Sequence, residues 1–146
     1  MKPKRTPRPA LPPPGLRPRL RRDQLSDMAL CHIQAMDSIA RGDATSATLW
    51  QVAEAALAWS RAAELMRVGE VEMTAQLELA LSLIERYKRT GRVLFTGREY
   101  QDAKAGVAVM DELAEHTDRA TALAACEWAN RRVVAMMAAS RARAAA

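Results

Sequence analysis

The sequence predicts an all-α fold, a bundle of four helices, or of five, with a long C-terminal helix, preceded by a disordered arm rich in proline and arginine. Of its 146 residues, 30 are alanine and only six are aromatic, a composition typical of helical proteins. After residue 23, apolar side chains recur at spacings of three and four residues, the period of an amphipathic helix. All seven prolines precede Arg19, and they exclude a regular helix from that first stretch.

Residues 1–22 are therefore expected to form an arm outside the folded domain, which is expected to comprise residues 23–146. The arm contains eight basic residues and no acidic one, whereas the rest of the chain contains 14 basic and 17 acidic side chains, a formal charge of −3. A basic, disordered segment can follow a phosphate backbone or enter a minor groove, so we predict that the arm binds nucleic acid. The residues expected to make these contacts are Lys2, Lys4, Arg5, Arg8, Arg17, Arg19, Arg21 and Arg22. Two alternatives stay open: a solubilising tail without a fixed partner, and an arm that docks onto an acidic protein surface.

The glycines divide the domain into helices of similar length. A first helix is expected over about residues 24–41 and ends at Gly42, because glycine readily adopts the left-handed conformation that closes many helices. Capping residues at 43–46 begin a second helix, which runs to about residue 68 and ends at Gly69. A third helix, over about residues 71–90, ends at Gly91.

The stretch "GRVLFTGREY", residues 91–100, interrupts the helical pattern. Its apolar run is too short for a helix and has no evident strand partner, so we interpret it as a structured loop in which Phe95 plugs the end of the bundle. Thr96 and Glu99 have the spacing of a capping box, which predicts that the next helix begins here.

The last helix is expected to be continuous over about residues 98–140, because helical spacing persists and no proline stops it. At 1.5 Å per residue it would be about 64 Å long, roughly twice its neighbours, and its distal half would expose apolar side chains. We therefore predict a homodimer that buries this half. The interface residues expected are Leu123, Trp128, Val133, Val134 and Met137. The alternative is a break at "EHTD", residues 115–118, where Thr117 or Asp118 caps a fifth helix that folds back in a monomer.

No cluster of residues has the pattern of a catalytic or metal site. Cys31 and His32 are neighbours, so on a helix their side chains point about 100° apart and cannot chelate from one face. Glu112 and His116 lack the Glu-x-x-His spacing of di-iron bundles. There is no G-x-S-x-G motif and no glycine-rich phosphate loop. We predict no catalytic residue, no metal, no cofactor and no enzyme activity.

The two cysteines, Cys31 and Cys126, lie far apart in a chain that is large enough to form its own core. We predict reduced thiols and a cytoplasmic location, with a Cys31–Cys126 disulfide as the alternative. No apolar run approaches the length of a membrane span, and the N-terminus lacks the apolar segment of a secretory signal, so no membrane partner is expected.

Two stretches resemble helix-turn-helix units. Residues 51–66 resemble the general family, but Leu57 occupies the glycine position of the turn. Residues 123–137 are similar to the C-terminal unit of Fis-type regulators, but Ala129 replaces the turn glycine. Both stretches fit an uninterrupted helix better.

The body, about residues 25–134, resembles small helical proteins of proteobacterial plasmids and prophages, some of them labelled Fis-like. The stretches "ALCHIQAMDSIARGDAT", "TGRVLFTGREY" and "MDELAEHTD" carry this resemblance. It implies an accessory or regulatory protein of a mobile element and transfers no site residue. We therefore predict a non-enzymatic, dimeric protein that binds nucleic acid through its arm. The alternative is an adaptor or inhibitor that binds another protein through its helical body.

Overall fold

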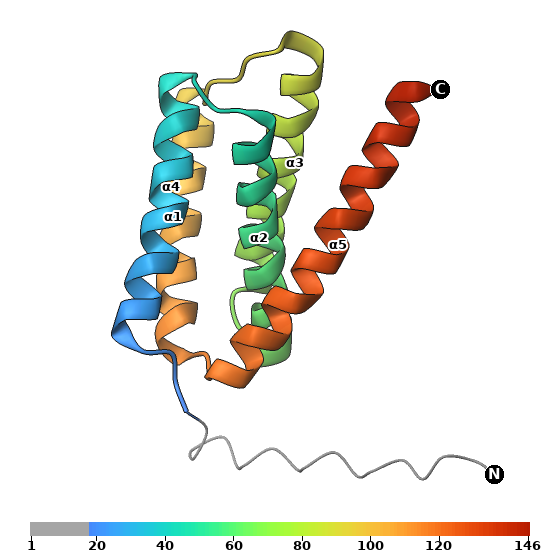
Figure 1. Cartoon of the computed structure of the whole chain (residues 1–146). Helices are drawn as coiled ribbons and strands as arrows, with labels where there is room; N and C mark the ends of the chain where they lie inside the picture. Colours follow the sequence, from blue (N-terminus) through green and yellow to red (C-terminus); the bar gives the residue numbers. More distant parts are fainter. Residues whose placement is uncertain (1–17) are drawn as a thin grey trace, which may run out of the picture.

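The prediction of an all-α bundle is confirmed by the computed structural model, which describes residues 18–146 (Figure 1). This part of the chain forms five helices, and its only bridge of strand type is a single residue pair, Arg19 with Asp118. The helices are α1 (Arg22–Arg41), α2 (Ser46–Met66), α3 (Glu70–Thr90), α4 (Gly97–His116) and α5 (Arg119–Ala145).

Local signals fix most helix ends close to the expected positions. Gly42 and Gly91 follow α1 and α3 with φ of 74° and 71°, the left-handed conformation that glycine adopts without strain. Thr96 caps α4 through the expected capping box with Glu99. Gly69 differs from the prediction: α2 already ends at Met66, its C-cap Arg67 takes the left-handed conformation, and Gly69 is the N-cap of α3.

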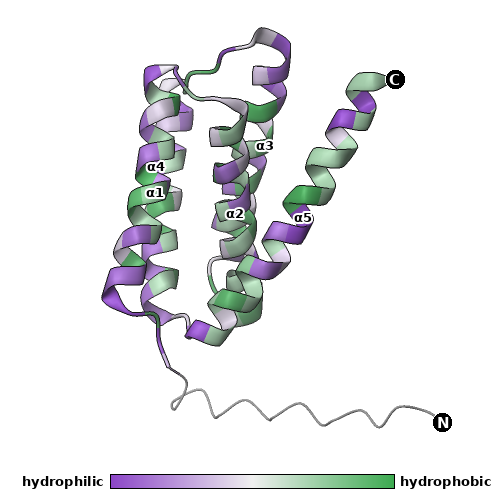
Figure 2. Ribbon diagram, viewed as in Figure 1, coloured by the Kyte–Doolittle hydropathy of each residue, from purple (hydrophilic) through white to green (hydrophobic). Residues whose placement is uncertain are grey.

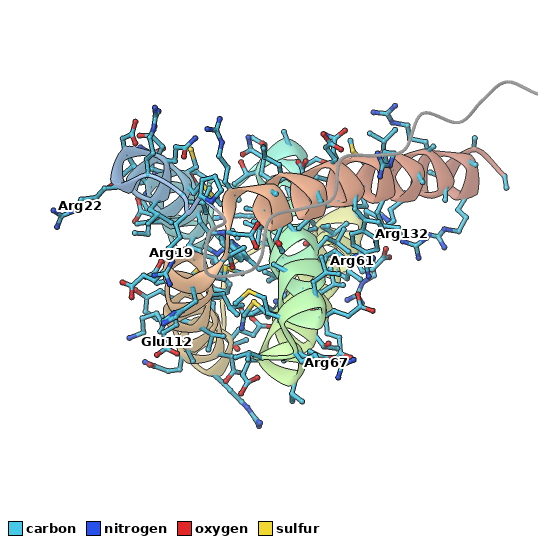
Figure 3. The ribbon with its side chains drawn as sticks, turned by 90° about the horizontal axis from the view of Figure 1, so that it is seen from below. Arg19, Arg22, Arg61, Arg67, Glu112 and Arg132 are labelled. Carbon is cyan, nitrogen blue, oxygen red and sulfur yellow. The ribbon has the colours of Figure 1, made fainter. Side chains whose placement is uncertain are left out.

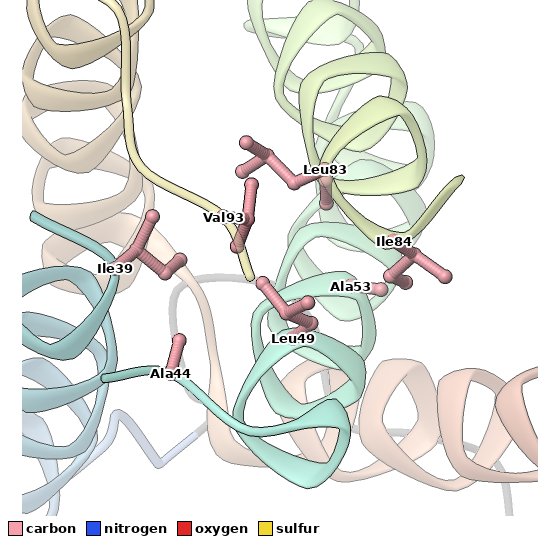
Figure 4. Packing of buried hydrophobic residues seen from close by; sticks show 8 residues of the cluster. Ile39, Ala44, Leu49, Ala53, Leu83, Ile84 and Val93 are labelled. Carbon is pink, nitrogen blue, oxygen red and sulfur yellow. The ribbon is translucent and has the colours of Figure 1, made fainter. Parts of the chain in front are cut away.

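Helices α1 to α4 form a four-helix bundle, with α1 beside α4 and α2 beside α3 (Figure 1). Helix α2 is central, because it packs against α1, α3, α4 and α5. One core cluster fills the end of the bundle near the loop at 91–96 (Figure 4). Its main members are Ile39, Ala44, Leu49, Ala53, Leu83, Ile84 and Val93.

The loop at 91–96 closes this end of the bundle, but with a different side chain from the one expected. Val93 is only 3% exposed and belongs to the cluster, whereas Phe95 is half-buried beside it. The ring of Phe95 also faces Tyr100, with ring centroids 6.0 Å apart. Val93 is therefore the residue that fills the end of the core, and Phe95 covers it from outside.

The continuous last helix predicted for residues 98–140 is wrong, and the alternative break at residues 115–118 is right. Thr117 has an extended backbone and is buried, with its hydroxyl donating to the Leu113 carbonyl. Asp118 then caps α5, because its Oδ1 accepts the Thr121 backbone N–H at 2.8 Å. The chain turns at this point, and α5 folds back across the bundle (Figure 1).

Candidate nucleic-acid interface

Helix α5 rests on α2 by a row of small side chains. The buried residues of α5 are Ala122, Ala125, Ala129 and Val133, and beyond Val133 none is buried. No Cα atom of α1 or α3 lies within 8 Å of a Cα atom of α5. The C-terminal part of α5 therefore leans away from the bundle (Figure 1), and a groove lies on each side of the helix.

The structure divides the charge of the domain between α5 and the other helices. Helix α5 has five arginines and one glutamate, whereas residues 23–118 have nine basic and sixteen acidic side chains, a formal charge of −7. The formal charge of −3 for residues 23–146 hides this contrast, because it averages an acidic bundle and a basic helix. The contrast becomes visible when the charged residues are counted separately for each helix. The arginines of α5 are Arg119, Arg131, Arg132, Arg141 and Arg143, all exposed.

The polar and apolar residues of α5 alternate without a clear stripe in its distal part (Figure 2). Leu123 and Val134 are 54% and 59% exposed and lie eleven residues apart, which on a helix places them on nearly the same side. Neither residue is among the buried residues of α5, and we call this exposed side the outer side of the helix.

The base of the predicted arm lies beside the start of α5. The Pro18 carbonyl accepts the Arg119 backbone N–H at 2.8 Å, next to the bridge between Arg19 and Asp118. From there the chain enters α1, where Arg22 points outward (Figure 3). The arm and α5, the two most basic parts of the chain, thus meet at one corner of the molecule.

Of the eight arm residues predicted to bind nucleic acid, the structure describes three. Lys2, Lys4, Arg5, Arg8 and Arg17 lie outside the described residues. Arg21 pairs with Asp23 at 3.0 Å, which occupies its guanidinium. Within residues 18–146, Arg19 and Arg22 are exposed and form no ion pair.

The five predicted interface residues of α5 do not form one surface. Leu123 and Val134 lie on the outer side, but Val133 is buried against Leu57 of the same chain. Trp128 and Met137 are half-buried in that same cluster, and the Trp128 ring lies 5.7 Å from the Arg61 guanidinium carbon. The reason is the break at 117: once α5 folds back, α2 covers side chains that a projecting helix would leave exposed.

The groove between α5 and α3 has a volume of about 520 Å³ and a basic rim. Its floor is apolar, with Trp50, Leu81, Ile84 and Met136 among the lining residues. Of residues 18–146, its rim contains Lys88, Arg132, Arg143 and a single carboxylate, Glu85. The hydrogen bond from Lys88, at 2.7 Å, and nearby cations that include Arg143 lower the pKa of Glu85 despite slight desolvation.

The groove between α5 and α1 has a volume of about 270 Å³ and the opposite character. Glu54 lies on its α2 floor and accepts a hydrogen bond from the Asn130 side chain at 3.1 Å. In the part of the chain that the structure describes, no lysine or arginine lines it. Burial lowers the pKa of His32, against the opposing charge of Asp111, so the imidazole stays neutral near pH 7.

Both cysteines line this α1–α5 groove, Cys31 from α1 and Cys126 from α5. Both thiols are free, and the separation of the two helices keeps their Cα atoms more than 8 Å apart, beyond the reach of a disulfide. The alternative of a Cys31–Cys126 bridge is therefore wrong for this structure. Burial, followed by the charge of Glu54, raises the pKa of the Cys126 thiol. Sequence reasoning missed the groove because its polar residues come from three separate helices.

Both helix-turn-helix resemblances fall inside continuous helices, the first in α2 and the second in α5. Among residues 18–146, no three His, Cys, Asp or Glu side chains come together as ligands for a metal ion. None of the helices in this part of the chain combines the length and apolar character needed to cross a membrane. Comparison with family models, with curated proteins and with solved structures gave no match for this chain.

Proposed function

We propose that this protein is a non-enzymatic nucleic-acid-binding protein that holds its ligand with the arm at residues 1–22 and with the arginines of α5. The observation that carries the proposal is the separation of charge. A basic helix lies on a four-helix body of formal charge −7, and the basic arm begins beside that helix. Phosphates are attracted to the arm and α5 and repelled by the body, which orients the molecule on a polyanion.

Binding is expected to be independent of sequence. Arginine contacts to phosphates position a protein on a duplex but do not read bases. The two stretches that resemble helix-turn-helix units lie inside the continuous helices α2 and α5, so neither of them supplies a recognition helix after a turn. Helix α5 has 27 residues, about 40 Å at 1.5 Å per residue, which is comparable to one turn of B-DNA.

We further propose that the protein acts as a homodimer in an accessory or regulatory role of a mobile element. The exposed Leu123 and Val134 on the outer side of α5 support self-association, because both would be removed from water. Two copies would present two arms, and the second arm would then bind at a high effective concentration.

The test is duplex binding across a series of NaCl concentrations by the intact chain and two variants. Deleting residues 2–17 removes five cations and leaves every described residue in place, so the slope of log K against log salt should fall by up to about 4.5, at 0.9 for each phosphate contact. Changing four α5 arginines to glutamine should lower it by up to about 3.6. These four are Arg131, Arg132, Arg141 and Arg143.

The matched control changes four cations of the bundle to glutamine and should leave the slope nearly unchanged. These are Arg67, Arg89, Arg98 and Lys104, all exposed. The proposal is wrong if the intact protein has no affinity for nucleic acid, or if affinity survives both the deletion and the α5 exchange.

A second function, an adaptor or inhibitor that binds another protein, is favoured by the α3–α5 groove. An apolar floor that includes Trp50 and Met136 between two helices is a surface that can receive an amphipathic helix. A heteromeric complex that persists at high salt and after deletion of residues 2–17 would support this function over nucleic-acid binding.

A further inference from the structure

The α1–α5 groove has the size and shape of a small-molecule site. Its floor is α2, where Ala55 and Ala58 leave open space, and its walls are Cys31 of α1 and Cys126 of α5. The space exists because α1 and α5 both pack on α2 without reaching each other. At about 270 Å³ it is slightly below the range of about 300–1,000 Å³ that holds drug-sized ligands, so a ligand with one ring fits.

The charge of the lining residues determines whether the groove favours a cationic or an anionic ligand. Among the lining residues within 18–146, Glu54 is the only carboxylate, its Oε1 accepts a single hydrogen bond, from Asn130, and no lysine or arginine opposes it. His32 adds no positive charge near neutral pH, because burial lowers its pKa. A cation therefore gains an unopposed carboxylate in this groove, whereas an anion meets only repulsion.

The rest of the lining selects an organic cation over a metal ion. Trp59 supplies an aromatic surface, and Met28 with the two cysteines supplies polarisable sulfur. A strongly hydrated metal ion would need several ligating side chains, and residues 18–146 bring no such set together. We propose that the α1–α5 groove binds a small apolar organic cation, such as a quaternary ammonium or a protonated aromatic amine, beside Glu54.

The two native thiols make the proposal testable without a label. Benzyltrimethylammonium is the probe, benzylsulfonate is its anionic counterpart, and uncharged iodoacetamide reports the reactivity of each thiol in Cys31→Ser and Cys126→Ser variants. At saturation the cation should slow alkylation of both thiols severalfold, because they lie on opposite walls of one groove. The anion should slow neither. Protection by both probes, or of one thiol only, would overturn the proposal.

The second part of the test uses the variant Glu54→Gln, and Glu85→Gln in the α3–α5 groove is its matched control. Loss of the carboxylate should raise the dissociation constant of benzyltrimethylammonium about fivefold, the strength of a partly exposed ion pair, while the control should leave it unchanged. Ala55→Phe fills the groove from its floor and should abolish binding with the helix content retained. An unchanged affinity in either groove variant would show that the probe binds elsewhere. None of these results depends on nucleic-acid binding.

Discussion

The two grooves beside α5 share one wall and one floor, yet they differ in charge. On the α1 side, a carboxylate and two thiols line a space of about 270 Å³, and no lysine or arginine of the described chain lies among the lining residues. On the α3 side, three cations and one carboxylate surround an apolar space of about 520 Å³. The same helix thus contributes Cys126 to one groove and Arg132 and Arg143 to the other. A helix that packs on a single neighbour can present a different chemistry on each flank.

The small residues of α5 produce this arrangement. Alanines let the backbones of α5 and α2 approach closely, so α5 is held by one narrow contact along its first half. Because both grooves use α5 as a wall, loss of this contact removes both grooves together.

The largest expected effect is therefore that of Ala129→Asp. Ala129 is fully buried between α5 and α2, and an unpaired carboxylate there should lower the free energy of unfolding by about 3 kcal/mol or more or detach α5. Urea unfolding measures the first outcome, and faster alkylation of Cys126 measures the second. Ala138→Asp, at an exposed site of the same helix, is the control. A stable variant in which Cys126 reacts no faster than in the wild type would contradict the described packing of α5.

The charge contrast itself can be measured with a thiol in each groove. Cys126 reports the α1 side in a Cys31→Ser chain, and Ala139→Cys reports the α3 side in a chain without the native cysteines. A cationic methanethiosulfonate should react faster than an anionic one at residue 126, and more slowly at residue 139. The two rate ratios should differ about tenfold at low salt and converge as salt screens the charges. Equal ratios of the cationic to the anionic reaction rate at residues 126 and 139 would show that the two grooves do not differ in charge.

The sequence predicted most of the bundle because its signals are local. Gly42, Gly91 and the Thr96–Glu99 box end or begin helices through contacts within a few residues, so their positions could be inferred without the fold. The break at Thr117 could not be decided in this way. Asp118 was recognised as a candidate cap, but helical spacing continues through it, and burial of Thr117 together with packing on α2 favours the break.

Of the candidate site, only the segment that is continuous in sequence could be predicted. The basic arm is visible in composition, whereas the basic character of α5 was hidden in the net charge of residues 23–146. The α1–α5 groove could not be predicted, because Cys31, Glu54 and Cys126 meet only after three helices pack. Val133 is a second example. The helical spacing marks it as an apolar position, but the spacing does not say that Leu57 of α2 covers it.

A smaller effect is expected from Asp118→Ala at the corner where α5 begins. The variant loses the acceptor for the Thr121 backbone N–H and hydroxyl, so the free energy of unfolding should fall by about 1 kcal/mol. Asp118→Asn keeps an acceptor at the cap and should recover most of that loss. Equal unfolding free energies for the wild type and the alanine variant would show that the cap does not hold the break between α4 and α5.

The smallest expected effect is the pH dependence that His32, beside the α1–α5 groove, gives to the free energy of unfolding. Burial lowers the pKa of His32 below 6.5, partly offset by Asp111, so the unfolded chain takes up this proton before the folded chain does. Stability should therefore be lost as pH falls from about 6.5 towards the folded pKa, by at most about 1.4 kcal/mol for each pH unit. Urea unfolding between pH 7.5 and 5, run on the wild type and on His32→Gln, measures this loss as a difference between two curves. The variant should lack it, and His116→Gln, at an exposed histidine, should keep it. If all three proteins respond alike, the loss comes from carboxylates elsewhere, and the imidazole does not contribute to the neutral lining of the α1–α5 groove.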